Sequence, residues 1–155
     1  VHHLPFADGS FQLVTCRRAA HHFSDIRQAL GEIYRVLASG GRVVIDDRSV
    51  PEDDFADRCM NFLDTLHDES HVREYRPSEW QSMMEDAGFA VEAVETYTRH
   101  RPITALTANV SEGNARRIQE TLAALTPGQR EVFNLIEKDG QFYHNHWFVM
   151  VSAVR

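Results

Sequence analysis

The chain has 155 residues, and its 16 basic and 23 acidic side chains give a formal net charge of −7. This length predicts one domain. The charge disfavours nucleic acid as a partner, because phosphate binding requires clustered lysine and arginine. Cys16 and Cys59 are far apart in the sequence and are expected to be free thiols in a reducing cytoplasm. The apolar run Trp147–Val151 is too short to cross a bilayer, and no secretory signal is expected.

The sequence from Phe11 to Asp47 predicts a strand–helix–strand unit. A strand over Phe11–Cys16 is followed by a helix over Ser24–Ala38, whose apolar residues have helical spacing. Ser24 is the expected N-cap, and the glycine pair at positions 40 and 41 is expected to end the helix. The second strand, Arg42–Asp47, contains a continuous β-branched run, typical of a parallel strand buried on both faces. The unit predicts an α/β sheet with its function at the carboxyl ends of its strands.

The rest of the chain predicts further helices and two strands. Three acidic residues at positions 52–54 open an amphipathic helix, and Ser78 begins a second helix through a capping box. The alternating segment Phe89–Tyr97 predicts a strand. Two more helices are expected to begin at Ser111 and at Thr126, which forms a capping box with the glutamine three residues later. The last segment, Gln141–Val154, is rich in β-forming residues.

Several stretches of the sequence resemble one enzyme family. They are Leu4–Val14, His21–Phe23, Glu32–Gly41, His71–Arg73, Trp80 and Ala87–Phe89. They resemble the class I S-adenosylmethionine-dependent methyltransferases, especially the ubiquinone/menaquinone biosynthesis type and its small-molecule relatives. The block Leu4–Gly41 is the specific part of this resemblance. Within it, Ser39 replaces the usual proline before the paired glycines, and Gln12 replaces the usual aspartate.

The resemblance implies a Rossmann-like sheet of seven strands in the order 3-2-1-4-5-7-6, with the last strand antiparallel. It assigns Phe11–Cys16 to the fourth strand, Arg42–Asp47 to the fifth, Phe89–Tyr97 to the sixth and the segment ending at Val154 to the seventh. The chain then forms one partial α/β domain, with a core unit at 1–50, substrate-covering helices at 51–88 and carboxyl-terminal strands and helices at 89–155.

The family's first three strands have no counterpart in the sequence, and neither do its glycine-rich cofactor loop and ribose-binding acidic residue. The first residue is Val rather than Met, so the chain is expected to be a fragment, a processed product or one begun at an unusual start codon. We therefore expect weak binding of S-adenosylmethionine, in the high-micromolar range or worse, since each lost ribose hydrogen bond costs about 1–3 kcal/mol. We also expect a homodimer through the exposed edge Phe11–Cys16.

The candidate cofactor residues follow the first strand. Arg17, Arg18 and His22 lie just beyond its carboxyl end, where α/β sheets bind ligands. The alternative is a solvated loop leading into the helix. The resemblance implies cofactor contacts from Cys16, Arg17, Arg18 and His22, with Phe6 on the adenine side.

The candidate substrate residues follow the second strand. Asp47 can bind substrate or accept a proton, or it can start a turn. Together with His22 and His71 it forms the set of candidate bases. By the resemblance, His71 and Arg73 bind an anionic or carbonyl group of the substrate. An apolar pocket is a further possibility, although helical spacing favours core positions for its members, which are Phe55, Met60, Phe62, Met83 and Met84.

The other histidines have less specific interpretations. His67 and His71 have the spacing of metal ligands on a helix, but a solvent-facing helix end is the favoured interpretation. His144 and His146 share one face of a strand and are expected at the surface.

The sequence thus predicts a cytoplasmic methyltransferase that acts on a small molecule and uses S-adenosylmethionine. The enzyme aligns the acceptor with the methyl group and supplies a base where the acceptor must lose a proton. Two alternatives are a non-catalytic, dimeric methyltransferase-like binding module and a histidine-based metal protein.

Overall fold

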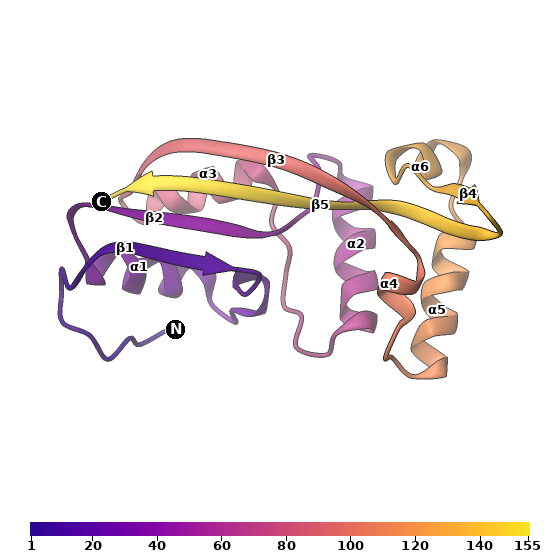
Figure 1. Cartoon of the computed structure of the whole chain (residues 1–155), viewed down its shortest axis with the longest axis horizontal. Helices are drawn as coiled ribbons and strands as arrows, with labels where there is room; N and C mark the ends of the chain where they lie inside the picture. Colours follow the sequence, from indigo (N-terminus) through magenta and orange to yellow (C-terminus); the bar gives the residue numbers. More distant parts are fainter.

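The computed structural model describes all 155 residues as one mixed sheet with helices packed against it (Figure 1). The elements in chain order are β1 (Phe11–Arg17), the 3-10 helix η1 (Ala20–His22), α1 (Ile26–Val36), β2 (Leu37–Ser49), α2 (Asp54–His67), α3 (Pro77–Asp86), β3 (Ala90–Pro102), α4 (Thr104–Thr107), α5 (Glu112–Ala123), α6 (Pro127–Val132), β4 (Ile136–Lys138) and β5 (Gln141–Val154). No helix has the length and apolar character that a membrane crossing requires.

The sheet has the strand order β1-β2-β5-β3, and the short strand β4 pairs with β5. The strands β1 and β2 are parallel, whereas β5 is antiparallel to both of its neighbours, β2 and β3. In the predicted numbering this is the order 4-5-7-6 with strand seven reversed, so the expected α/β class and topology are confirmed. Because β1 and β2 are parallel, their carboxyl ends meet at the same edge of the sheet.

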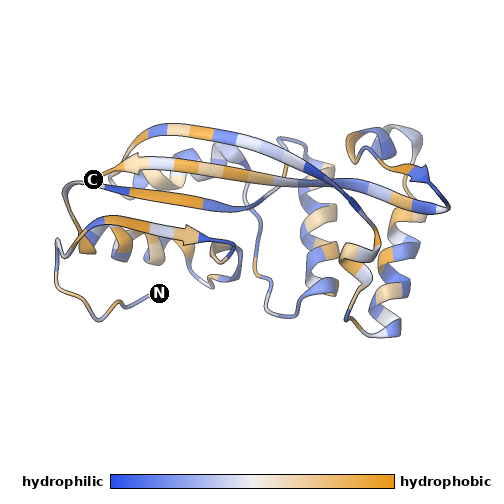
Figure 2. Ribbon diagram, viewed as in Figure 1, coloured by the Kyte–Doolittle hydropathy of each residue, from blue (hydrophilic) through white to orange (hydrophobic).

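The molecule has two separate hydrophobic cores, one in each half. The first lies between one face of the sheet and the helices α1 and α3, and includes Leu30, Ile45 and Trp80. The second joins α2 to the helices α4, α5 and α6, and includes Met60 and Phe133. Figure 1 shows β3 and β5 running from one half of the molecule into the other, and Figure 2 shows hydrophobic residues along β2 and β5 beside the first core. The region between the two cores is polar.

The burial of β2 differs from the prediction of a strand buried on both faces. Val43 and Ile45 are 0% and 1% exposed, whereas Val44 between them is half-buried. The alternation arises because α1 and α3 cover the face that carries Val43 and Ile45. A continuous apolar run was therefore not evidence for two covered faces in this strand.

The ends of α1 also differ from the prediction. Asp25, not Ser24, is the N-cap, and its side chain accepts a hydrogen bond from the main-chain N–H of Gln28 at 2.9 Å. The helix ends at Val36 and the chain enters β2 directly. The glycine pair lies inside β2, where an irregularity in its pairing with β1 lets Gly40 adopt a φ of +75°.

The other helix starts were predicted in part. Ser111 caps α5, and Thr126 forms the expected capping box at the start of α6. The helix α3, however, begins at Pro77, and its first turn is fixed by Glu79, which accepts a hydrogen bond from the N–H of Arg76 at 2.9 Å. The predicted box at Ser78 was therefore wrong, since proline at the first helical position had already set the start.

β1 lies at the edge of the described sheet, with β2 as its neighbour. On it, Leu13 is 56% exposed. The homodimer expected through this strand stays a prediction.

Candidate functional site

The carboxyl ends of β1 and β2 form the floor of the candidate site. After β1 the chain turns at Arg18, which has a φ of +52° and whose N–H donates to the main-chain oxygen of Asp46 at 2.9 Å. This bond ties the turn to β2, and the chain then enters η1, which carries His21 and His22. The short distance along the chain between β1 and η1 places both histidines over the end of β2.

Asp47 and His21 form a close pair at this position. Asp47 is fully buried, and its Oδ1 lies 2.5 Å from Nδ1 of His21. The same carboxylate accepts the main-chain N–H groups of His21, at 3.1 Å, and Arg48, at 2.7 Å. With Nδ1–H directed at the carboxylate, Nε2 of His21 carries the free lone pair. Asp47 therefore orients His21 and has no exposed oxygen with which to contact a substrate.

A second set of contacts lies beside this pair, on Asp46. Tyr97 on β3 donates its hydroxyl to Asp46 at 2.7 Å and accepts a hydrogen bond from Arg18 at 2.6 Å. The guanidinium of Arg18 also stacks over Phe148, 3.8 Å from the ring centroid. Burial opposes the ionisation of Asp46, but the hydrogen bonds from Tyr97 and Arg17 outweigh it and lower the pKa of the carboxyl group. These contacts hold the turn after β1 in place.

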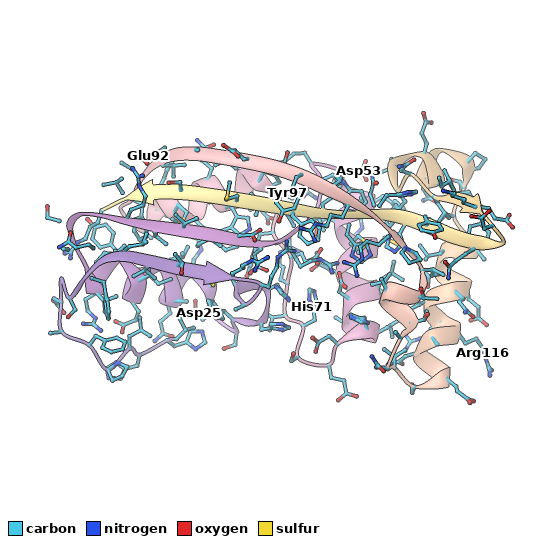
Figure 3. The ribbon with its side chains drawn as sticks, in the orientation of Figure 1. Asp25, Asp53, His71, Glu92, Tyr97 and Arg116 are labelled. Atoms are coloured by element: carbon cyan, nitrogen blue, oxygen red, sulfur yellow. The ribbon has the colours of Figure 1, made fainter.

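Two of the predicted bases, His22 and His71, join His21 at the same place. The ring centroids of His21 and His22 are 3.9 Å apart, and those of His21 and His71 are 6.0 Å apart. His71 is 9% exposed, and Figure 3 places it between the two halves of the molecule. Its Nε2 lies 3.1 Å from the side-chain oxygen of Asn61, and burial lowers its pKa. Asp47, His22 and His71 are therefore brought together, with His21 at their centre.

A buried charged cluster lies next to these histidines. Arg48, on β2, donates to Asp64 of α2 at 2.7 Å, and its Nε lies 2.6 Å from Oε1 of Glu74. The Arg48 N–H is not aligned with that oxygen, so both oxygens of Glu74 remain without a hydrogen bond. Glu74 is 1% exposed, and burial, followed by the charge of Asp64, raises its pKa well above the usual range.

His144 and His146 extend this cluster along β5, and the expectation that they are surface residues is wrong. They are 0% and 4% exposed, and their Nε2 atoms lie 3.2 Å apart. Burial lowers the pKa of His144 to about 4, and burial together with the charge of Arg48 lowers that of His146 to about 2. They face inward because β5, still paired with β3, extends past the end of β2 to the second core, where the ring of Phe133 lies 6.5 Å from that of His144. No group of three or more histidine, cysteine, aspartate or glutamate side chains in the chain has the arrangement of a metal site.

The remaining predicted site residues lie at various distances from this centre. Arg17 is close by, with a side chain that is 74% exposed and 3.1 Å from Asp46. Cys16 is half-buried in β1, where burial and the charge of Asp47 raise its pKa to about 11. Phe6 packs against Phe11 at the opposite end of β1 and does not join the cluster.

Two of the predicted substrate-binding residues contact other parts of the protein instead. The guanidinium of Arg73 pairs with Asp57 at 3.1 Å and with Glu79 at 3.0 Å. Phe55 packs on the second core, 6.0 Å from Phe133 between ring centroids. The methionines of the suggested apolar pocket are core residues of two different clusters, so that pocket does not form.

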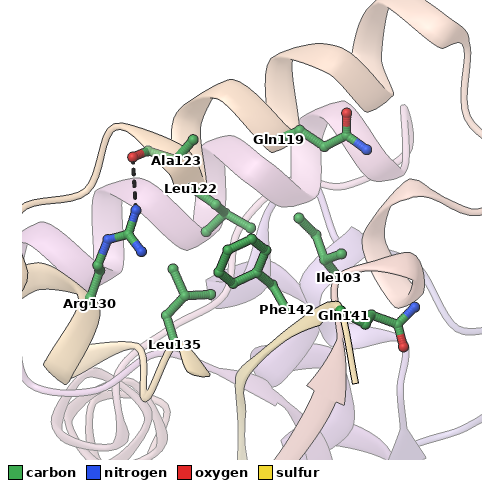
Figure 4. Close-up of a pocket in the computed structure, with 9 residues that line it drawn as sticks. Ile103, Gln119, Leu122, Ala123, Arg130, Leu135, Gln141 and Phe142 are labelled. Carbon is green, nitrogen blue, oxygen red and sulfur yellow. Dashed lines mark hydrogen bonds between the residues drawn. The ribbon is translucent and has the colours of Figure 1, made fainter. Parts of the chain in front are cut away.

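An apolar cavity lies away from the strand ends. It has a volume of about 460 Å³ and lies between α5, α6 and the β4–β5 hairpin, where Figure 4 shows its lining residues. Leu122, Leu135 and Phe142 give it an apolar wall. Arg130 at its rim already donates to the main-chain oxygen of Ala123 at 3.0 Å. The cavity therefore offers apolar volume but none of the titratable groups described above.

The fold and the site together define an α/β protein of the kind that binds a ligand across the carboxyl ends of parallel strands. Residues 1–45 match the model of the methyltransferase domain family. The chain is 47% identical over 94 residues to an uncharacterised methyltransferase, YcgJ, of Bacillus subtilis (strain 168), a match that spans 61% of this chain and 37% of that protein. It is 55% identical over 42 residues to a demethylmenaquinone methyltransferase of Thermus thermophilus, over 27% of this chain and 19% of that protein.

A solved structure of one of these relatives is similar to almost the whole chain. The crystal structure of the YcgJ protein superposes with a TM-score of 0.91 and 30% identity, over 99% of this chain and 68% of that chain. The chain belongs to the methyltransferase domain family. The sequence matches span well under two thirds of the curated relatives named above.

Proposed function

We propose that this chain transfers a methyl group from S-adenosylmethionine to a small-molecule acceptor. The observation that carries the proposal is the His21–Asp47 pair at the carboxyl ends of β1 and β2. It occurs in a chain whose family performs this chemistry. When bound, S-adenosylmethionine supplies an electrophilic methyl group on a sulfonium sulfur.

The turn after β1 suits the cofactor's polar part. Arg17 presents an exposed guanidinium, and the left-handed conformation of Arg18 turns the chain at the point where the ligand crevice of such sheets lies. We assign the main chain from Cys16 to Arg18 and the imidazole of His22 to the cofactor side. Tyr97 supports this turn through its hydrogen bonds to Arg18 and Asp46.

We propose His21 as the base for acceptors that must lose a proton. Its Nε2 is the free position of an imidazole whose Nδ1–H is held by a buried carboxylate, an arrangement that fixes the tautomer. Of the three predicted bases, Asp47 then acts as a positioning residue. His71 bonds to Asn61 and its pKa is lowered by burial, and His22 contacts Ser70.

The test is methyl transfer from methyl-labelled S-adenosylmethionine to a panel of phenolic, quinol and amine acceptors. We expect His21→Gln to lower kcat by about 100-fold or more, the typical contribution of a positioned base. Asp47→Asn should lower kcat and change its pH profile, and Asp47→Glu should restore part of the rate. The exposed His3 provides a control through His3→Gln. Full activity of the His21 variant on every acceptor would refute the assignment.

A further inference from the structure

A small polar cavity lies beside the His21–Asp47 pair. Its volume is about 100 Å³, and no hydrophobic residue lines it. The lining residues come from η1, β2, α2 and the segment that follows α2, and they are His21, Arg48, Asp64, His67, Asp68, His71 and Glu74. The side chain of Asp68 is 45% exposed and marks the solvent side of the cavity, whereas Glu74 lies at its buried side. The volume accommodates a few waters or one small polar group.

The charges around this cavity do not balance. Three carboxyl groups line it, from Asp64, Asp68 and Glu74, and the guanidinium of Arg48 is its one permanent positive charge, in contact with both Asp64 and Glu74. Arg48 hydrogen bonds to Asp64, and Asp68 accepts hydrogen bonds from Ser70. Glu74 is 1% exposed; the Nε atom of Arg48 lies 2.6 Å from its Oε1 without the alignment of a hydrogen bond, and its Oε2 has no hydrogen-bond donor. A buried carboxyl group without donors is costly unless a ligand supplies them.

We propose that this cavity binds the protonated amino group of a small-molecule ligand, with Glu74 and Asp64 as the recognising carboxylates. An ammonium group has three N–H donors and one positive charge. It can therefore donate hydrogen bonds to Glu74 and also offset the negative charge of the carboxylates that line the cavity. Water supplies donors but no charge. In the free chain, burial and the nearby Asp64 raise the pKa of Glu74, and a bound cation opposes that effect.

The position of the cavity indicates what the ligand is. His21 lines the cavity and also forms the pair with Asp47, so a bound amino group lies next to the proposed base. This part of the inference rests on the proposed function, and it names the methyl acceptor as an amine-bearing small molecule. Binding of the amino group itself does not depend on methyl transfer.

The experiment is a titration of the ¹⁵N-labelled 155-residue chain with methylammonium chloride, followed by amide and histidine-ring chemical shifts. We expect saturable shifts at His21 and across 64–74. The same concentrations of sodium chloride and of methanol provide the controls for charge and for a neutral donor. Equal responses to methylammonium and to either control, or no response to methylammonium, would overturn the proposal.

Variants locate the binding group. Glu74→Gln should weaken methylammonium binding at least tenfold, whereas Glu69→Gln, on the same segment but outside the cavity, should leave it unchanged. If Glu74→Gln loses its dispersed spectrum, Asp68→Asn at the solvent side serves instead, with an expected loss of threefold or more. Unchanged affinity in the folded variant contradicts the proposal. A parallel titration with 5′-methylthioadenosine, which keeps the cofactor's adenosine but has no ammonium group, separates the two hypotheses, because it can occupy the cofactor side without filling the cavity.

Discussion

Acidification should destabilise this chain through His144 and His146. Both side chains are buried, and their folded-state pKa values of about 4 and about 2 lie below the value of 6.5 of a free imidazole. In the unfolded chain they take up protons as the pH falls through 6.5, while in the folded chain they stay neutral down to about pH 4. The unfolded state therefore binds more protons, and stability falls with pH in this window. From pH 7 to pH 5 the loss is about 2 kcal/mol for each histidine.

The assay is urea unfolding, followed by circular dichroism at pH 7 and pH 5, of the wild type and of His146→Gln. Glutamine retains a hydrogen-bonding group opposite His144 but cannot be protonated. The loss of unfolding free energy between the two pH values should be smaller in the variant by about 2 kcal/mol. His3→Gln, at an exposed position, should behave as the wild type. An equal loss in wild type and His146→Gln would show that the burial argument is incorrect.

Other predictions concern packing, mobility and assembly. Leu30→Ala, at a fully buried position of α1, should lower the unfolding free energy by about 2–5 kcal/mol in urea titrations. Gly88→Ala should cost more than about 1 kcal/mol, because φ is +97° and the new methyl group would lie 3.2 Å from the Tyr34 ring; wild-type stability would contradict this. Hydrogen exchange should be faster across 51–75, the first part of the predicted substrate-covering region 51–88, than in α1, and equal protection would argue against a covering role. Leu13→Lys should abolish self-association in sedimentation at micromolar concentration, and a monomeric wild type would refute the dimer.

Much of the fold followed from local patterns. Helical spacing of apolar residues located α1, and proline or polar caps located the starts of α5 and α6. The order of the strands came from the family resemblance rather than from the residues themselves. The predicted helix boundaries were wrong where two neighbouring residues could both act as the cap, as at Ser24 and Asp25.

The site was predicted only in part. The rule that ligands bind at the ends of parallel strands located Asp47 and His22, but it gave no reason to prefer His21 over its neighbour. That distinction depends on the 2.5 Å contact between His21 and Asp47, which are 26 residues apart. Glu74 lies in a loop segment whose polar sequence predicts exposure to solvent. Its burial arises because that segment packs between β2 and α2. Long-range contacts of this kind leave no local pattern in the sequence.

The central claim is that the ends of β1 and β2 form the methyltransferase site, and mapping the cofactor product tests it most directly. S-adenosylhomocysteine is titrated into the ¹⁵N-labelled chain, and the amide shifts are followed to saturation. The account predicts shifts concentrated at residues 16–22 and 46–48, with smaller changes at Tyr97. Shifts confined to the cavity between α5, α6 and the β4–β5 hairpin, or no shifts at millimolar concentrations, would contradict it.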